Sequence, residues 1–204
     1  MSEMDAQFVQ ERNKIKSVFN LASLIYPIIE LSLIPQYRRT LLKLDLPSSL
    51  NVLDFATGTG ILAGEFFNRG HSVSGIDFSP RLLKRARKKY PQIEFELKDL
   101  FELAVEDIVK ADIVSMGYLL HGLSPELRKI ILQKAADIAA QYVIVFDHSH
   151  HMNWLTKFIE YLEGSHYKEF IASDKSKTFN DAGLKIINEF NVDEFGYCWV
   201  CRKK

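Results

Sequence analysis

The stretch Val52-Leu53-Asp54-Phe55-Ala56-Thr57-Gly58-Thr59-Gly60 decides the fold, because it joins a short buried strand, an acid and a tight glycine turn. A helix is predicted to begin directly afterwards, at Ile61. Glycine suits such a turn, since a Cβ would obstruct either the turn or a ligand close to the backbone. The next apolar run ends at Asp77, and an acid about 20 residues beyond such a turn is placed to bind ribose hydroxyls. The stretch therefore predicts a site for an adenosine-containing cofactor.

Strand and helix patterns alternate from residue 51 onward, which favours a parallel sheet. The strands are expected from residue 51 and at 72–77, 93–97, 111–116, 142–147, 185–190 and 197–202. The helices are expected at 61–68, 80–89, 104–110, 124–140, 154–162 and 176–182. The link 191–196 is too short for a crossover helix, so the last two strands should pair antiparallel. The prediction is an α/β fold: a mostly parallel seven-stranded sheet with an antiparallel C-terminal hairpin and helices on both faces.

The N-terminal segment 17–46 is helical in pattern, and we expect breaks at Pro27 and Pro35. Its most apolar stretch, 21–34, contains Glu30 and Pro27 and falls short of the roughly 20 apolar residues that a spanning helix needs. No transmembrane segment is therefore predicted. An apolar helix here is still suited to lie against a greasy ligand or a membrane surface.

The amino-acid composition limits the classes of partner that the chain is expected to bind. The 204 residues suffice for one domain, and 26 Lys and Arg balance 26 Asp and Glu, with a pI of about 7.0, so nucleic acid is not expected as a partner. The two cysteines, Cys198 and Cys201, imply no disulfide framework, and on a strand their thiols would face opposite sides. The polar start of the chain shows no signal peptide. We expect a cytoplasmic monomer or homodimer.

Two classes of cofactor fit the glycine turn. Residues 58–63 match the dinucleotide fingerprint G-x-G-x-x-A, so an NAD(P)-dependent oxidoreductase is one hypothesis. However, Asp54 before the turn would repel a pyrophosphate, whereas it suits the ammonium of a methionine moiety. Asp99 follows the third predicted strand, where it can accept a hydrogen bond from an adenine amino group. Acids after three consecutive parallel strands suit a ligand with an amino acid, a ribose and an adenine.

These motifs resemble those of a known family. The stretch 54–60 resembles motif I of the class I S-adenosylmethionine-dependent methyltransferases, and Gly75-Ile76-Asp77-Phe78-Ser79-Pro80 resembles their second motif. Lys98-Asp99-Leu100 is similar to the adenine-contacting motif, and 112–121 to the fourth-strand motif that borders the substrate. The segment 18–38 and the Ala182-Gly183-Leu184 turn are similar to the ubiquinone/menaquinone C-methyltransferase group.

The resemblance implies a Rossmann-like fold, S-adenosylmethionine as cofactor, and a single domain over 1–204 with a helical lid at 1–46 and a core at 47–204. Asp54 would meet the methionine ammonium and Asp77 the ribose hydroxyls. The remaining cofactor contacts that it implies are the backbone of Ala56, Thr57, Gly58 and Gly60, the adenine neighbours Phe78, Asp99 and Leu100, and Met116 and Gly117 near the sulfonium. Tyr26 in the lid would either cover the sulfonium or pack on the sheet.

Methyl transfer requires alignment, exclusion of water and, for carbon or oxygen acceptors, a base within hydrogen-bond reach. The catalytic candidates near the strand ends are Tyr118, His121 and His148. Further candidates for lining the acceptor space are Tyr161, His166 and Tyr167. His150 and His151 beside His148 are suitable metal ligands, but neighbours in sequence rarely converge on one ion, so no metal is predicted.

The prediction is methyl transfer from S-adenosylmethionine to a small-molecule acceptor of apolar or aromatic character. The alternatives are an NAD(P)-dependent oxidoreductase and a non-catalytic protein that binds adenosylmethionine.

Overall fold

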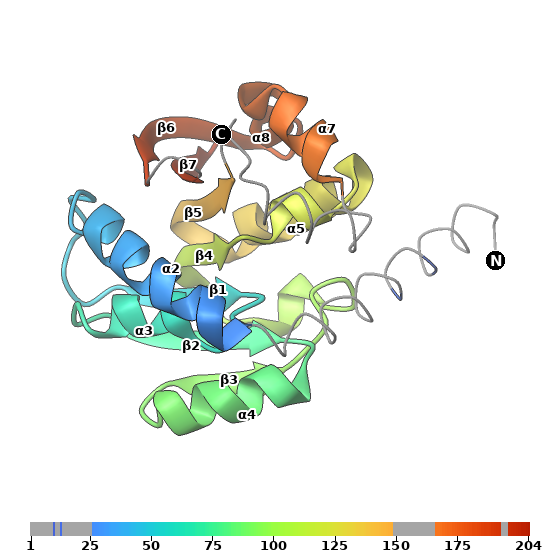
Figure 1. Ribbon diagram of the computed structural model, residues 1–204. Coiled ribbons are helices and arrows are strands. Elements are labelled where there is room, and N and C mark those ends of the chain that lie inside the picture. The colour runs from blue at the N-terminus through green and yellow to red at the C-terminus, as the bar shows by residue number, and fades with distance from the viewer. Residues whose placement is uncertain (1–9, 11–12, 14–25, 149–165, 193–195) are drawn as a thin grey trace.

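The computed structural model describes residues 10, 13, 26–148, 166–192 and 196–204, and in them a seven-stranded sheet with the order β3-β2-β1-β4-β5-β7-β6 (Figure 1). The strands are β1 (Asn51–Phe55), β2 (Ser72–Asp77), β3 (Glu94–Leu97), β4 (Ala111–Gly117), β5 (Ala139–His148), β6 (Leu184–Asn191) and β7 (Gly196–Lys203). The first five strands are parallel, and β7 pairs antiparallel with both β5 and β6. The predicted mostly parallel sheet with an antiparallel hairpin is confirmed.

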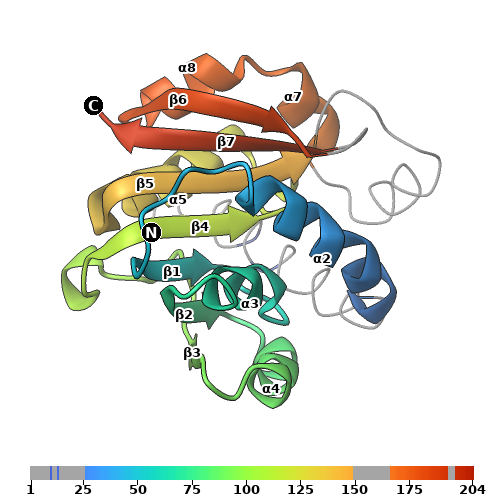
Figure 2. The same ribbon diagram turned by 90° about the vertical axis from the view of Figure 1, so that its left-hand side faces the viewer.

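Helices cover both faces of this sheet, as predicted. They are α2 (Tyr26–Leu41), α3 (Ile61–Phe67), α4 (Pro80–Lys89), α5 (Pro125–Ile138), α7 (Tyr167–Ala172) and α8 (Lys175–Asp181), with 3-10 turns η1 (Val105–Asp107) and η2 (Leu120–Gly122). Side chains of α2, α3 and α4 share one apolar core with the sheet, and those of α5, α7 and α8 share the other. Figure 2 shows α2 and α3 in front of the strands and α5 behind them.

The alternation of side chains along the central strands explains the two cores. In β5, Val143 and Val145 pack toward α5, whereas Ile144 and Phe146 pack toward α3. A strand that is buried on both faces needs a nearly continuous apolar run. Cys198 and Cys201 of β7 likewise face opposite cores, and burial raises the pKa of the Cys201 thiol to about 12. Neither a shared metal nor a reactive thiolate fits this arrangement.

The predicted helix break at Pro35 is wrong, because α2 runs through this proline. The residues directly before Tyr26 lie outside the described ones, so the break at Pro27 stays a prediction. Pro27 lies in the first turn, where a backbone N–H has no partner within the helix. Pro35 removes one hydrogen bond inside the helix, but packing on α3 holds the helix together across it. Tyr37 is buried in the core, and Arg38 donates from Nε and Nη2 to the carboxylate of Glu65 on α3 at 3.1 and 2.9 Å.

The other differences between the predicted and the observed helices are smaller. The short helix expected at 104–110 is only the 3-10 turn η1, and α7 was not predicted from the sequence. The helix expected at 154–162 lies outside the described residues. The N-caps Ser79 and Ser124 are confirmed, since each accepts a hydrogen bond from the third residue of its helix, with proline at the first position. Among the described residues, no helix is long and apolar enough to cross a membrane.

We expect Pro35→Ala to raise the free energy of unfolding by roughly 1–2 kcal/mol, because alanine restores a backbone donor and removes the steric conflict inside α2. Urea denaturation followed by circular dichroism is the measurement. Pro47→Ala, in the connection before β1, is the matched control and should leave stability unchanged or slightly lower. A Pro35→Ala protein no more stable than the wild type would contradict this account of α2.

Candidate functional site

Acidic side chains gather where the parallel strands end. Asp54 lies in β1, Asp77 ends β2 and Asp147 lies near the end of β5, and their exposed fractions are 1%, 4% and 0%. Asp99 follows β3 and is half-buried. Burying a carboxylate is costly unless hydrogen bonds or a positive charge compensate it. The partners of each acid therefore indicate what the site is built to hold.

Asp54 is held by two hydroxyls at the centre of the sheet. Its Oδ1 accepts a hydrogen bond from Ser115 Oγ at 2.6 Å, and its Oδ2 accepts one from Thr57 Oγ1 at 2.7 Å. Burial raises the pKa of Asp54 to about 7, although these bonds and the Ala63 backbone act in the opposite direction. The N-cap position of α3 is Gly60, so Asp54 is not the N-cap residue. A nearby cation would favour the ionised form of this carboxylate.

The glycine turn is closed by Asp77. Oδ2 of Asp77 accepts a hydrogen bond from the Gly58 N–H at 2.9 Å, and Oδ1 accepts one from the Ser79 N–H at 2.8 Å. Burial raises the pKa of Asp77 to about 6, against the effect of these N–H groups. Gly60 has a φ of 77°, and a Cβ there would lie 2.8 Å from Cζ of Phe95. The turn therefore requires glycine at this position.

Five further residues that were predicted to contact the cofactor lie in the turns after β1, β2 and β3. Ala56 has a positive φ of 50°, which is unfavourable for alanine, and Thr57 is buried. Phe78 is half-buried just after β2, and Asp99 Oδ1 accepts a hydrogen bond from the Phe101 N–H at 2.9 Å. Leu100 is buried in the core on the α5 side. The segment after β3 thus forms a closed turn beside the strand that leads to Phe78.

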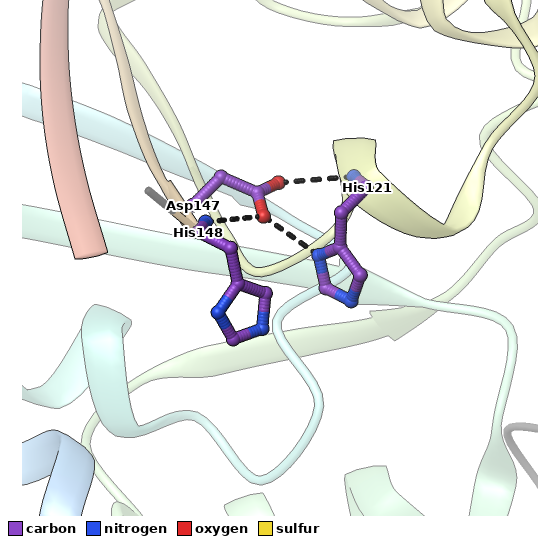
Figure 3. A group of neighbouring side chains, drawn as sticks. All are labelled: His121, Asp147 and His148. Carbon is purple, nitrogen blue, oxygen red and sulfur yellow. Dashed lines mark hydrogen bonds and ion pairs between the residues drawn. The ribbon is translucent and has the colours of Figure 1, made fainter. Parts of the chain in front are cut away.

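A second polar cluster lies at the ends of β4 and β5 and is centred on Asp147 (Figure 3). Oδ1 accepts hydrogen bonds from His121 Nδ1 at 2.6 Å and from the His148 N–H at 2.8 Å. Oδ2 accepts from the backbone N–H groups of Leu120 at 2.8 Å and His121 at 3.2 Å. Burial acts to raise the pKa of Asp147, but the charge and hydrogen bond of His121 outweigh it, so the pKa is lowered.

Asp147 and His121 thus form a carboxylate–imidazole dyad. Because an ionised carboxylate only accepts hydrogen bonds, Nδ1 of His121 carries the hydrogen. The lone pair of the neutral imidazole then lies on Nε2, directed away from Asp147. This is the geometry that orients an imidazole to take a proton from a bound acceptor.

Aromatic rings surround the dyad. The His148 ring lies 4.6 Å from that of His121, 4.9 Å from that of Tyr118 and 5.1 Å from that of Tyr167, measured between centroids. Tyr118 has a φ of 54°, a strained value for a bulky residue, and its hydroxyl donates to Gln36 Oε1 on α2 at 3.1 Å. The three catalytic candidates, Tyr118, His121 and His148, are therefore brought together, with Tyr167 beside them.

The trio His121, Asp147 and His148 also has the ligand types of a metal site, with one atom from each within 4.8 Å of the others. The carboxylate, however, already accepts four N–H groups, which fills its four lone-pair positions. Asp147 would have to give up hydrogen bonds to bind an ion. The arrangement fits a hydrogen-bonded dyad better than a ligand set, and His150 and His151 lie outside the described residues.

Three residues, Met116, Gly117 and Tyr26, were predicted to lie near the sulfonium of the cofactor. Met116 is fully buried in the core on the α5 side, so its side chain packs in the interior, whereas Gly117 lies against the Tyr37 hydroxyl. Tyr26 begins α2, but its side chain lies outside the described residues. Sequence reasoning missed Ser115, which faces Asp54 across the pairing of β1 with β4. Only the order of the strands reveals that contact.

Comparison with known proteins gives matches to methyltransferases over parts of the chain. A family model described as a methyltransferase domain matches residues 52–142, from β1 into β5. The demethylmenaquinone methyltransferase of Chlorobaculum tepidum is 46% identical over 68 residues, which is 33% of this chain and 28% of that protein. Its counterpart in Chlorobaculum parvum is 56% identical over 45 residues, 22% of this chain and 19% of that protein. The matches thus span less than a third of either relative's length.

Solved structures share the whole fold. A TehB-like methyltransferase from Corynebacterium glutamicum has a TM-score of 0.66 at 18% identity, covering 91% of this chain and 100% of that one. The mitomycin 7-O-methyltransferase has a TM-score of 0.70 at 14% identity, covering 97% and 67%. The described residues have the Rossmann-like α/β fold of methyltransferases. Residues 52–142, a little under half of the chain, match the methyltransferase domain, and shorter stretches show local homology to demethylmenaquinone methyltransferases.

The raised pKa values of Asp54 and Asp77 predict that stability of the protein alone falls as pH rises from about 4 to about 7. The folded state binds these protons more tightly than the unfolded state, so their stabilising effect is complete at low pH and is lost on ionisation. Asp54→Asn should reduce the difference in unfolding free energy between pH 5 and pH 8 by on the order of 2 kcal/mol.

Urea denaturation at both pH values measures this difference. Asp112→Asn is the control, because Asp112 is at the opposite end of the sheet and its pKa is lowered by hydrogen bonds from Asn51 and Gln141. If Asp54→Asn shows the same pH dependence as the wild type, the buried carboxylate does not titrate as described.

Proposed function

We propose that this protein binds S-adenosylmethionine at the glycine turn and transfers its methyl group to a small aromatic or apolar acceptor. The observation that carries the proposal is the placement of Asp54, Asp77 and Asp99 along one edge of the sheet. They belong to β1, β2 and the turn after β3, which are neighbours in the strand order. That series matches a cationic amino acid, a ribose and an adenine in sequence.

The roles proposed for Asp54 and Asp77 are consistent with their surroundings. Asp54 binds the ammonium, and the cation lowers its raised pKa. Asp77 retains lone pairs for the ribose hydroxyls, while Phe78, Asp99 and Leu100 frame the adenine. The other proposed contacts are the backbone of Ala56, Thr57, Gly58 and Gly60, with Met116, Gly117 and Tyr26 near the sulfonium. When bound, the cofactor supplies an activated methyl group.

On the acceptor side, we propose that His121 removes a proton from the acceptor. Asp147 holds the imidazole in the required tautomer and stabilises the imidazolium that forms. The rings of Tyr118, His148 and Tyr167 around it suit a planar aromatic molecule with an acidic hydroxyl or ring carbon. The names of similar proteins agree: demethylmenaquinone methyltransferases, and an O-methyltransferase of neocarzinostatin biosynthesis bound to 1,4-dihydroxy-2-naphthoic acid.

The proposal also covers the domain organisation, the class of acceptor, the oligomeric state and the cellular setting. Residues 1–204 act as one domain, with 1–46 as a lid over a core at 47–204. The hydrogen bond between Tyr118 and Gln36 supports this, because it links α2 to the acceptor side of the site. The balance of 26 basic and 26 acidic residues supports a small-molecule acceptor rather than nucleic acid. A cytoplasmic monomer or homodimer is the setting we propose.

Two alternatives are separated by direct binding. An NAD(P)-dependent oxidoreductase would bind NADH and not adenosylmethionine, which calorimetry distinguishes. A non-catalytic binding protein would bind adenosylmethionine without turnover on a panel of aromatic hydroxyl compounds that includes 1,4-dihydroxy-2-naphthoic acid. The dyad of His121 and Asp147 favours an enzyme, since a protein that only binds the cofactor does not need it.

We predict that Asp77→Ala weakens binding of S-adenosylhomocysteine at least tenfold, about 1.4 kcal/mol or more, because charge-assisted hydrogen bonds to the ribose are lost. Titration calorimetry gives the dissociation constant. Asp112→Asn, near the opposite end of the strands, serves as the control and should bind as the wild type does. An unchanged affinity in a folded Asp77→Ala protein would refute the ribose assignment.

We also predict that His121→Ala lowers kcat by about 10²–10⁴ on whichever panel compound is methylated, while the affinity for S-adenosylhomocysteine stays within a factor of about two. Asp147→Asn should lower kcat as well, because an amide disturbs the tautomer of His121. Release of S-adenosylhomocysteine is the assay. Wild-type turnover by His121→Ala would exclude the imidazole as the base.

A further inference from the structure

Lys134 of α5 forms an unusual contact with the segment 98–103, which comes directly after β3. Its half-buried ammonium donates hydrogen bonds to the backbone carbonyls of Leu100 at 2.9 Å, Phe101 at 2.8 Å and Leu103 at 2.8 Å. An ammonium has three N–H groups, so these three bonds use them all. Burial lowers the pKa of Lys134, while the charge of Asp99 acts to raise it. The side chain thus lies close to Asp99 and is fully committed to one short segment.

The backbone of the segment 98–103 needs side-chain contacts to hold it, because the segment follows the strand at the edge of the sheet. Among the described strands, β3 lies at the edge of the sheet and pairs with β2 alone, so no described strand lies on the outer side of the segment. The segment folds back on itself, with the Phe101 N–H donating to Asp99 Oδ1 at 2.9 Å and the Glu102 N–H donating to the Asp99 carbonyl at 3.1 Å. Its carbonyls at 100, 101 and 103 consequently point to one place, where Lys134 lies.

We propose that Lys134 is a positioning residue for the adenine end of the cofactor site, an inference that rests on the proposed function. By binding three carbonyls of one turn, Lys134 fixes the backbone that carries Asp99, and with it the orientation of the Asp99 carboxylate toward the adenine amino group. Leu100 and Leu103 anchor the same turn by burial in the core, but apolar contacts are not directional. The ammonium supplies the directional constraint.

A merely stabilising role would lower the melting temperature and leave recognition of the base unchanged. The two roles are therefore separated by base selectivity, using S-adenosylhomocysteine and S-inosylhomocysteine, which has a carbonyl oxygen where adenine has its amino group. The wild type should bind the adenine compound about tenfold more tightly, since a carboxylate facing that oxygen is left without a donor. In Lys134→Met, the affinity for the adenine compound should fall about tenfold and the selectivity should approach one.

Two variants complete the design. Lys134→Arg retains a charged donor group and should recover part of the selectivity. Lys129→Met, an exposed lysine of the same helix, is the matched control and should keep wild-type selectivity. If Lys134→Met does not fold, Lys134→Gln replaces it in the same comparison. Calorimetry of each folded protein with both compounds gives the selectivity directly.

The possible outcomes test the positioning role of Lys134 separately from the proposed function on which it rests. If the wild type binds neither compound, the proposed function fails. If the wild type binds both equally, or if Lys134→Met or its replacement keeps the selectivity of the wild type, the positioning role of Lys134 is overturned while the methyltransferase assignment stands.

Discussion

The hydrogen-bonded carboxylate of Asp54 is the interaction on which the site depends, because it joins three elements at the centre of the sheet. The acid lies in β1, Thr57 lies in the glycine turn and Ser115 lies in β4. Burial raises the pKa of Asp54 to about 7, although the hydrogen bonds from the two neutral hydroxyls act to lower it. A cation beside this carboxylate would favour its ionised form, and the ammonium of a methionine moiety is the group that we propose for this place.

Strand β4 connects the two halves of the site. Ser115 contacts Asp54 on the cofactor side, and two residues further on the strand reaches Gly117, against the Tyr37 hydroxyl. The chain then turns through Tyr118, whose positive φ directs it into η2 and His121. A displacement of β4 would therefore alter both the surroundings of Asp54 and the position of His121. This continuity explains how a domain of modest size can hold a cofactor and an acceptor next to each other.

Buried Arg128 reinforces the acceptor half of the site. It donates to the carbonyls of Leu120 at 3.2 Å and Leu123 at 2.8 Å, on either side of His121, and pairs with Glu169 of α7 at 2.9 Å. The turn that carries His121 and the helix that carries Tyr167 are thus tied to one side chain. If His121 is the base, as we propose, such support matters, because catalysis is sensitive to small displacements of a catalytic group.

The features that could be predicted from the sequence are those that are local in the chain. The glycine turn, the acids near the ends of the first three strands and the C-terminal hairpin each depend on a short run of residues, and the structure contains all of them. Contacts between distant residues could not be predicted in this way. Asp147 meets His121 only because β5 lies beside β4, and β7 inserts between β5 and β6. The error at Pro35 has the same origin, since tertiary packing of Tyr37 and Arg38 overrides a local helix breaker.

The most direct test of this account is a crystal structure of the protein with S-adenosylhomocysteine bound. We predict the amino group of the ligand beside Asp54, both ribose hydroxyls on Asp77, and the adenine between Phe78 and the turn at Asp99. The sulfur should face the rings of Tyr118 and His148. A ligand bound elsewhere on the protein, or a site that stays empty at saturating concentration, would contradict the assignment.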